Sequence, residues 1–238
     1  MSFDRRFHSR ALAFSLAGAC AVLGVATTAF GGMLDGIAHR PPARVRAIAA
    51  HLRAPQDFAV PLNADVLREW NHFVGTEEGR RFVRRGKARM ERYRPMVEAK
   101  MRQYGVPRAL LAIPFVETGW RNFPPGPPYY GVGLWQFVRT TARAYGLRVD
   151  EKVDERLDVA KATDAAMRLL ARHHRRFRNW GLAIVAYNGG EGATRRAVAS
   201  VGRNPWKVVG AGAEATRGYL ARVYALALVL AEPAALVR

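Results

Sequence analysis

The chain has 238 residues, of which 50% are hydrophobic and 24% charged, and these shares exclude a chain that is disordered throughout. Its 38 Lys and Arg residues against 19 Asp and Glu residues give a formal net charge of +19, which favours polyanionic partners but indicates no fold. Because Cys20 is the one cysteine, an intramolecular disulfide is excluded.

The first 30 residues have the pattern of an export segment. Arg5, Arg6 and Arg10 precede an uncharged, largely apolar run over residues 11–30. This pattern predicts a signal peptide, but the run approaches the ~20 residues that span a bilayer, so an uncleaved membrane anchor stays open. Lipidation at Cys20 is a third alternative. All three place the rest of the chain outside the cytoplasm, in the periplasm or cell envelope.

The remaining chain is predicted to be helical. Residues 31–61 are expected to form a linker, with short helical potential at residues 45–52 between prolines. Apolar residues then recur at helical spacing, which predicts helices over residues 64–74, 82–104, 108–117, 139–145, 158–177, 180–187, 192–201 and 216–230. No series of alternating apolar and polar residues indicates a sheet. The fold class is therefore all-α with at most minor β, with a helical N-terminal extension over residues 62–106 and a main domain over residues 107–232.

Glu117 departs from the pattern of its surroundings. It ends the most apolar helix of the chain outside the export segment, and a loop with four prolines and four glycines follows at residues 119–133. A carboxyl at the edge of an apolar wall is partly desolvated, which raises its pKa and keeps the proton needed by a general acid. On position alone, a glutamate that points into water is favoured, because charged residues are common at helix ends.

Other candidate sites have weaker patterns. His173 and His174 are flanked by arginines and lack further ligands at metal-binding spacing, so no metal and no cofactor are expected. The acidic residues between positions 150 and 158 do not have the spacing of a calcium-binding loop. Clusters of Arg and Lys are typical of nucleic-acid binding, but an export segment argues against a nucleic-acid partner.

Three blocks of sequence, in order, carry a family resemblance: ETG at residues 117–119, GLWQF at 133–137 and AYNGGEG at 186–192. They resemble the soluble lytic transglycosylase (SLT) domain family, most closely the branch of membrane-bound lytic murein transglycosylase D. The resemblance begins near residue 63 and continues to Thr216 and Tyr219. Three blocks at family-like spacing are much more specific than one.

The resemblance implies a lysozyme-like, α-helical catalytic domain over residues 107–232 and peptidoglycan glycan strands as the substrate. Glu117 would protonate the β-1,4 glycosidic oxygen between N-acetylmuramic acid and N-acetylglucosamine. The same carboxylate would then draw a proton from the muramyl C6 hydroxyl, whose attack closes a 1,6-anhydro ring. This scheme differs from the two-carboxylate chemistry of most glycosidases. A muramidase and a peptidoglycan-binding protein without activity are the alternatives.

The resemblance also implies a set of substrate-binding residues: Thr118, Gly133, Gln136, Tyr187, Asn188, Glu191 and Tyr219. Two features depart from the family. Thr118 replaces the usual serine, and residues 123–130 are rich in proline and tyrosine where the family has a small polar loop. Phe137 is expected in the core, whereas core and groove are both open for Trp135. Glu191 is expected either to begin the next helix or to line the groove.

Overall fold

The computed structural model describes residues 42–53, 58–124, 131–211 and 214–232. The predicted export segment and the centre of the proline-rich loop lie outside these ranges. Within them, the structure is helical, and β pairing is limited to two isolated bridges, Val132 with Phe137 and Val149 with Asp154. The predicted all-α fold is confirmed. No helix in these ranges is long and apolar enough to cross a lipid bilayer.

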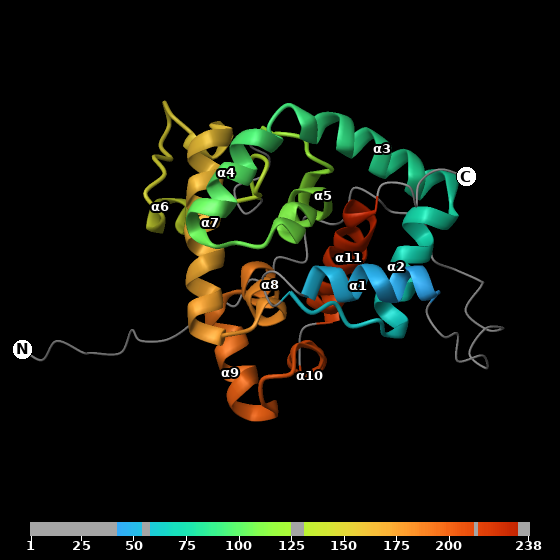
Figure 1. The fold of residues 1–238 in the computed structure, drawn as a ribbon. Helices are drawn as coiled ribbons and strands as arrows, with labels where there is room; N and C mark the ends of the chain where they lie inside the picture. The colour runs from blue at the N-terminus through green and yellow to red at the C-terminus, as the bar shows by residue number, and fades with distance from the viewer. Residues whose placement is uncertain (1–41, 54–57, 125–130, 212–213, 233–238) are drawn as a thin grey trace, which may run out of the picture.

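The elements follow one another from α1 to α11 along the chain (Figure 1). They are α1 (Ala43–Arg53), α2 (Ala64–Gly75), α3 (Glu77–Glu91), α4 (Arg94–Tyr104), the 3₁₀ helix η1 (Arg108–Leu111), α5 (Ala112–Thr118), α6 (Arg139–Ala144), the 3₁₀ helix η2 (Glu155–Leu157), α7 (Val159–Phe177), α8 (Trp180–Gly189), α9 (Glu191–Val201), α10 (Pro205–Gly210) and α11 (Glu214–Ala231). Helix α1 lies in the range that was predicted to be a linker with short helical potential.

Side chains at the helix ends explain several of these boundaries. The Asn63 Oδ1 accepts a hydrogen bond from the Val66 N–H at 3.1 Å, and the Asp158 carboxylate accepts from the N–H groups of Ala160 and Lys161 at 3.0 Å each. Such caps satisfy backbone donors that have no partner inside the helix. At the C-terminal end of α4, Gly105 has a φ of 65°, a left-handed conformation that glycine adopts without strain.

Two of the predicted helices differ in detail from the structure, and one helix was missed. The predicted helix at residues 82–104 is two helices, because the chain turns near Tyr93 and Pro95 lies in the first turn of α4, where its missing N–H does no harm. The predicted helix at residues 108–117 begins as the 3₁₀ helix η1, with the Leu110 N–H bonded to the Pro107 carbonyl. Helix α10 was not predicted, although Asn204 caps it.

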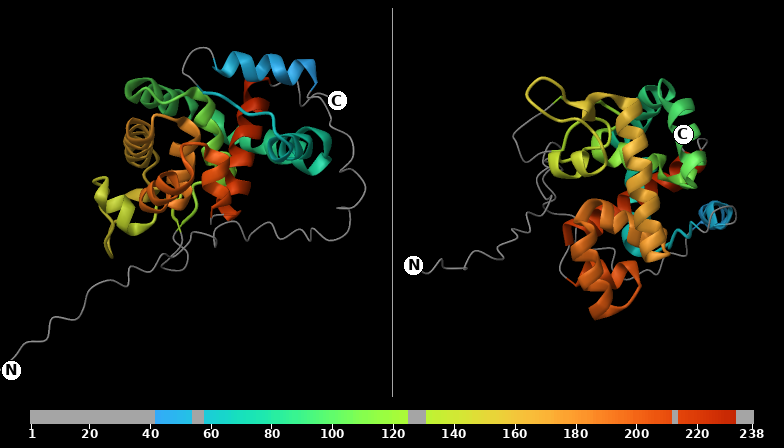
Figure 2. Two further views of the ribbon diagram at one scale, coloured as in Figure 1. Left: turned by 90° about the horizontal axis from the view of Figure 1, so that it is seen from below. Right: turned by 90° about the vertical axis from the view of Figure 1, so that its left-hand side faces the viewer.

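Helix α11 lies in the middle of the molecule and packs against α1, α2, η1, α5, α8 and α10 (Figures 1 and 2). Helix α7 forms one flank and packs against α4, α8 and η2. The N-terminal helices α1 and α2 therefore contact the same central helix that contacts α5. Since α5 carries Glu117 near its end, α11 connects the N-terminal extension with the candidate site.

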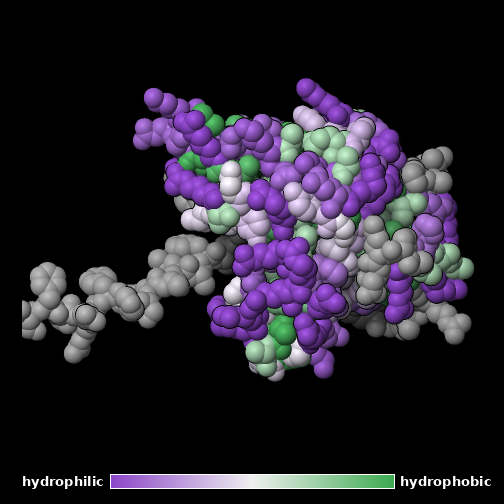
Figure 3. All heavy atoms as spheres, turned by 60° about the vertical axis from the view of Figure 1, so that its left-hand side comes forward, coloured by the Kyte–Doolittle hydropathy of each residue, from purple (hydrophilic) through white to green (hydrophobic). Residues whose placement is uncertain are grey.

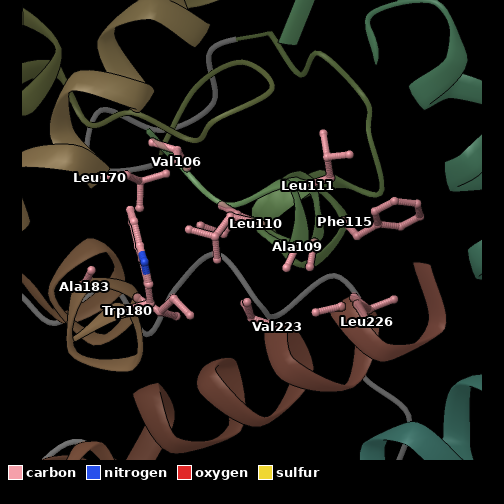
Figure 4. Close-up of a cluster of buried hydrophobic side chains, with 14 of the residues drawn as sticks. Val106, Ala109, Leu110, Leu111, Phe115, Leu170, Trp180, Ala183, Val223 and Leu226 are labelled. Carbon is pink, nitrogen blue, oxygen red and sulfur yellow. The ribbon is translucent and has the colours of Figure 1, made fainter. Parts of the chain in front are cut away.

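The core is formed where η1, α5, α7, α8 and α11 meet. Leu110 from η1, Leu170 from α7 and Trp180 from α8 point toward one another, with Val223 and Leu226 of α11 below them (Figure 4). Burial of a large apolar side chain contributes about 1.5–3 kcal/mol. In contrast to this core, the face in Figure 3 is largely hydrophilic, with scattered hydrophobic residues.

Helix α3 packs closely against α5. A Cβ atom on Gly86 would lie 2.3 Å from Cε1 of Phe115, which is closer than side chains approach in proteins. The ring of Phe82, from the same face of α3, meets the Phe115 ring edge-on at 6.3 Å between centroids. Helix α3 therefore holds the outer side of α5, whose last turn carries Glu117.

Candidate active site

Glu117 lies in the last turn of α5. The preceding residues of this short helix, from Ala112 to Phe115, are buried, whereas the Glu117 side chain keeps part of its surface accessible. Gly119 ends the helix at a φ of 56°, and Trp120 follows at 61°. A left-handed conformation is unusual for a tryptophan and needs support from its surroundings, and the Trp120 side chain is buried. The chain thus turns sharply away directly after Glu117.

The Glu117 carboxyl faces α11. The Tyr219 hydroxyl donates a hydrogen bond to the Glu117 Oε1 at 2.7 Å, across 102 positions of sequence. Burial raises the pKa of Glu117 from 4.5 to about 7, while the bond from Tyr219 and the positive charge of Arg222 lower it in part. The carboxyl therefore exchanges its proton near neutral pH, and a group that both gives and takes a proton needs such a pKa.

A tight turn follows the proline-rich loop at residues 131–137. Val132 and Phe137 exchange two backbone hydrogen bonds of 3.1 and 3.2 Å, which close the turn. Gly133 has a φ of 78°, and a Cβ atom there would lie 2.0 Å from the backbone oxygen of Arg156. The structure thus places Gly133 where no larger residue fits.

Buried polar contacts hold this turn against the α7 side of the molecule. The residue Arg156 is 4% exposed, and its side chain pairs with Asp154 at 2.6 Å and donates to the Phe137 carbonyl at 3.0 Å. The Trp135 indole N–H donates to the Thr163 hydroxyl of α7 at 2.9 Å. Trp135 and Phe137 are both buried. The prediction for Phe137 is confirmed, and Trp135, for which two positions were open, also belongs to the core.

Gln136 lies between these two buried aromatic residues and is partly exposed. Its φ of 51° is left-handed, which is uncommon for a residue with a side chain. The Gln136 Nε2 donates to the Gly133 carbonyl at 2.8 Å, so the side chain folds back over its own turn. Strained residues of this kind persist where the surroundings fix them, and they are frequent in active sites.

The end of α8 brings two further predicted residues to the site. The Tyr187 hydroxyl donates to the Trp135 carbonyl at 2.7 Å, which links α8 to the tight turn. Burial raises the pKa of Tyr187 well above its usual value, and the charge of Glu117 raises it further, so the two groups are neighbours. The Asn188 Oδ1 accepts a hydrogen bond from the Thr216 hydroxyl of α11 at 3.0 Å. Tyr187 thus connects α8 to the tight turn, and Asn188 connects it to α11.

The two remaining predicted residues, Thr118 and Glu191, form side-chain contacts with helix residues other than Glu117. Thr118 is 4% exposed, and its hydroxyl donates to the Pro114 carbonyl at 3.1 Å, one turn back along α5. Glu191 is the first residue of α9, where its charge suits the positive end of the helix. Its carboxylate pairs with Arg172 at 3.3 Å and Arg176 at 3.1 Å on α7. The structure therefore groups Glu117 with Tyr187 and Tyr219, whereas Thr118 and Glu191 point to other partners.

Two residues at the site were not predicted from the sequence. Arg222 lies one turn after Tyr219 on α11, and its charge acts on Glu117. Arg222 follows Tyr219 by three residues on a predicted helix, which places both side chains on the same face, and this spacing was the available signal. Asn122 donates to the Leu157 carbonyl at 2.8 Å and accepts from the Leu134 N–H at 3.1 Å, which fixes the two ends of the proline-rich loop. No pattern in the sequence indicates this role.

Comparison with known proteins finds a family model that matches the region around Glu117. Residues 95–209 match the family model described as the transglycosylase SLT domain. These residues, slightly less than half of the chain, are therefore similar to a transglycosylase SLT domain. The matched region begins in α4 and ends in α10, so it includes Glu117, the tight turn and the end of α8 but stops before Tyr219.

Three curated proteins are similar to parts of this chain. Membrane-bound lytic murein transglycosylase D of Escherichia coli strain K12 is 31% identical over 111 residues, and the same protein of strain CFT073 has the same identity. This alignment covers 46% of the present chain but 24% of each relative. A protein of Alteromonas sp. (strain M-1), whose name refers to tributyltin chloride resistance, is 30% identical over 115 residues, which are 48% of the present chain and 55% of that protein. The chain thus spans about a quarter of the transglycosylases and about half of the third relative.

Proposed function

We propose that this protein is a peptidoglycan lytic transglycosylase that cleaves the β-1,4 bond between N-acetylmuramic acid and N-acetylglucosamine and leaves 1,6-anhydro ends. The SLT domain supports the reaction class, and so do the relatives named as lytic murein transglycosylases. The observation that carries the proposal is the partly accessible Glu117 side chain, with a pKa of about 7, in the last turn of a largely buried helix.

In the proposed first step, protonated Glu117 gives its proton to the glycosidic oxygen, and the bond from this oxygen to the muramyl C1 breaks. With a pKa of about 7, a large share of the side chains carries this proton at neutral pH. The Tyr219 hydroxyl occupies Oε1 at 2.7 Å, which leaves Oε2 for the substrate. The resemblance implies that Tyr219 contacts the substrate. Its hydrogen bond to Glu117 gives it a second role, which is to orient the acid.

In the second step, the Glu117 carboxylate takes the proton of the muramyl C6 hydroxyl, and the C6 oxygen bonds to C1. This step closes the anhydro ring and returns the proton to Glu117, so no water is consumed. The ionised form is stabilised between the two steps by the Tyr219 hydrogen bond and the charge of Arg222, both of which lower the pKa of Glu117. Burial favours the protonated form of Glu117, and these two partners favour the ionised form, so the side chain can act first as an acid and then as a base.

One observation favours this reaction over hydrolysis by a muramidase. Among the described residues, the groups that shift the pKa of Glu117 are a tyrosine and an arginine, with no carboxylate among them. A second carboxylate of a retaining glycosidase would lie about 5–5.5 Å from the acid, and its charge would raise the pKa of Glu117. The supply of a nucleophile by the substrate itself agrees with a site that has one carboxyl.

The tight turn and α8 would form the groove around the sugar. Gln136 is partly exposed next to Gly133, and Tyr187 and Asn188 approach from the end of α8. Because the Tyr187 hydroxyl donates to the Trp135 carbonyl, we assign it a positioning role that fixes the turn relative to Glu117. Thr118 and Glu191 would act on the substrate only after exchanging their present partners.

The products of digestion test the proposed reaction. Purified peptidoglycan is incubated with the full chain, and the released fragments are analysed by mass spectrometry. Anhydro-muramyl ends, which weigh one water less than reducing ends, are expected. Reducing muramyl ends would show a muramidase, and binding without release would show a protein that only binds the wall.

We further propose that the protein works in the cell envelope, outside the cytoplasmic membrane. The charged N-terminus followed by the apolar run at residues 11–30 supports export, and the substrate lies in the same compartment. A reporter that is active only in the periplasm, fused after Gly32, should be active. An inactive reporter with good expression of the fusion in the cytoplasm would contradict export.

A further inference from the structure

Three arginine side chains gather at the C-terminal end of α5, next to the turn that follows Glu117. The Arg89 Nη1 of α3 donates to the Gly119 carbonyl at 2.9 Å, and the Arg121 Nε donates to the Thr118 carbonyl at 3.4 Å. Arg85 lies one turn before Arg89 on α3, at the i, i+4 spacing that places two side chains on the same face of a helix. The charges of Arg121 and Arg85 act on Arg89 and, after burial, lower its pKa.

The positive charge of this cluster is not balanced within the described part of the protein. Elsewhere on α3, Arg80 and Arg84 pair with Glu77 at 3.4 and 2.9 Å. No described carboxylate forms an ion pair with any of the three clustered arginines. Like charges on the same surface repel, so an anion bound between them would be stabilised.

Capping of α5 explains part of the cluster. Cations near a helix C-terminus interact favourably with its carbonyl groups, and Arg89 and Arg121 both do so. Capping leaves Arg85 unexplained, because its exposed side chain makes no hydrogen bond or ion pair with the described residues. Each guanidinium group has five N–H donors, and the two capping arginines use few of theirs. The cluster therefore keeps donors as well as charge for a ligand.

We propose that Arg85, Arg89 and Arg121 bind a carboxylate of the peptide that the muramyl residue of the substrate carries, an inference that rests on the proposed function. Muramic acid carries its peptide on the lactyl group, and such peptides end in carboxylates. Gly119, to which Arg89 is bonded, is two residues after Glu117. A peptide extends by up to ~3.3–3.6 Å per residue, so three or four residues reach roughly 10–14 Å from the sugar. Guanidinium groups bind carboxylates through paired, charge-assisted hydrogen bonds.

Three forms of one substrate test this site. Glycan strands with their peptides, strands whose peptides were removed by an amidase, and strands whose peptide carboxylates were converted to amides are each cleaved by the full chain. The variants are Arg85→Gln and Arg85→Lys. Arg81→Gln is the matched control, since Arg81 is an exposed arginine of the same helix that lies 3.9 Å from Glu77.

For Arg85→Gln, we expect KM on peptide-bearing strands to rise about threefold to tenfold at unchanged kcat, as for the loss of one exposed charged contact. KM on the other two substrates should stay at the parent value. Arg85→Lys should recover most of the loss, and Arg81→Gln should behave as the parent. A structural role of Arg85 would instead affect all three substrates alike.

Equal effects of Arg85→Gln on all three substrates, or no effect on any, would overturn the proposal. If the parent cleaves none of the substrates, the proposed function fails separately from the site. Sedimentation of the protein with peptide-bearing and amidated strands then decides the site: weaker binding of Arg85→Gln to the former alone supports it, and equal binding of parent and variant overturns it.

Discussion

Replacing Glu117 with glutamine removes the transferable proton of this side chain and nearly preserves its shape. Glutamine is nearly isosteric, and its side-chain oxygen can still accept the hydrogen bond that Tyr219 donates at 2.7 Å. The variant loses the transferable proton and the negative charge. Loss of general acid catalysis alone should slow cleavage by ~10²–10⁴-fold, and by more because the same group also serves as the base.

The effect of this substitution on stability follows from the pKa. Its rise from 4.5 to about 7 on folding corresponds to about 3 kcal/mol between the protonation states. Because the folded pKa is the higher one, the contribution of Glu117 to the stability of the parent is greatest below pH 4.5 and is lost as the pH rises through 7. Glu117→Gln has no such loss. At pH 8 it should exceed the parent by about 1–3 kcal/mol, with allowance for partial solvent exposure and a weaker bond from Tyr219.

Two measurements on the same protein samples check this reasoning. Release of muropeptides gives the rate, and unfolding in urea at pH 5 and pH 8 gives the free energy of unfolding. Slow cleavage together with a stability gain at pH 8 that shrinks at pH 5 is expected. Release at the parent rate would refute the catalytic assignment. Equal pH dependence of stability in parent and variant would refute the argument from burial.

Other residues of the site give three further predictions. Tyr219→Phe removes a hydrogen bond that lowers the pKa of Glu117, so the alkaline limb of the pH–rate profile should move to higher pH, and an unmoved limb would contradict that role. Tyr187→Phe leaves a carbonyl of the tight turn without its donor and should cost ~0.5–1.5 kcal/mol of unfolding free energy, with a drop in kcat; parent-like values of both would mean that this bond is irrelevant. Gly133→Ala should destabilise the protein far more than Gly105→Ala in thermal unfolding, because both glycines have positive φ but a Cβ meets a backbone oxygen at 2.0 Å only at Gly133. Similar melting temperatures for the two variants would refute the steric explanation.

The sequence alone determined the fold class and the position of the candidate acid. Helical spacing of apolar residues is a local property, so most helices of the described chain were predicted within a few residues. The break before α4 was missed, although Pro95, which cannot donate a backbone hydrogen bond inside a helix, was the available signal. Glu117 stood out because a carboxyl directly follows an apolar helix and precedes a loop.

Only the tertiary structure decided what acts on that acid and what supports the turn beside it. The Tyr219 hydroxyl reaches Glu117 across 102 positions, and the Tyr187 hydroxyl reaches the Trp135 carbonyl across 52. Sequence patterns report neighbours within a helix, whereas these contacts exist because α11 and α8 pack beside α5 and the tight turn. The same holds for Gly133, whose lack of a side chain is explained by the Arg156 backbone packed against it. The elements are set by local spacing, and the chemistry of Glu117 is set by how those elements pack.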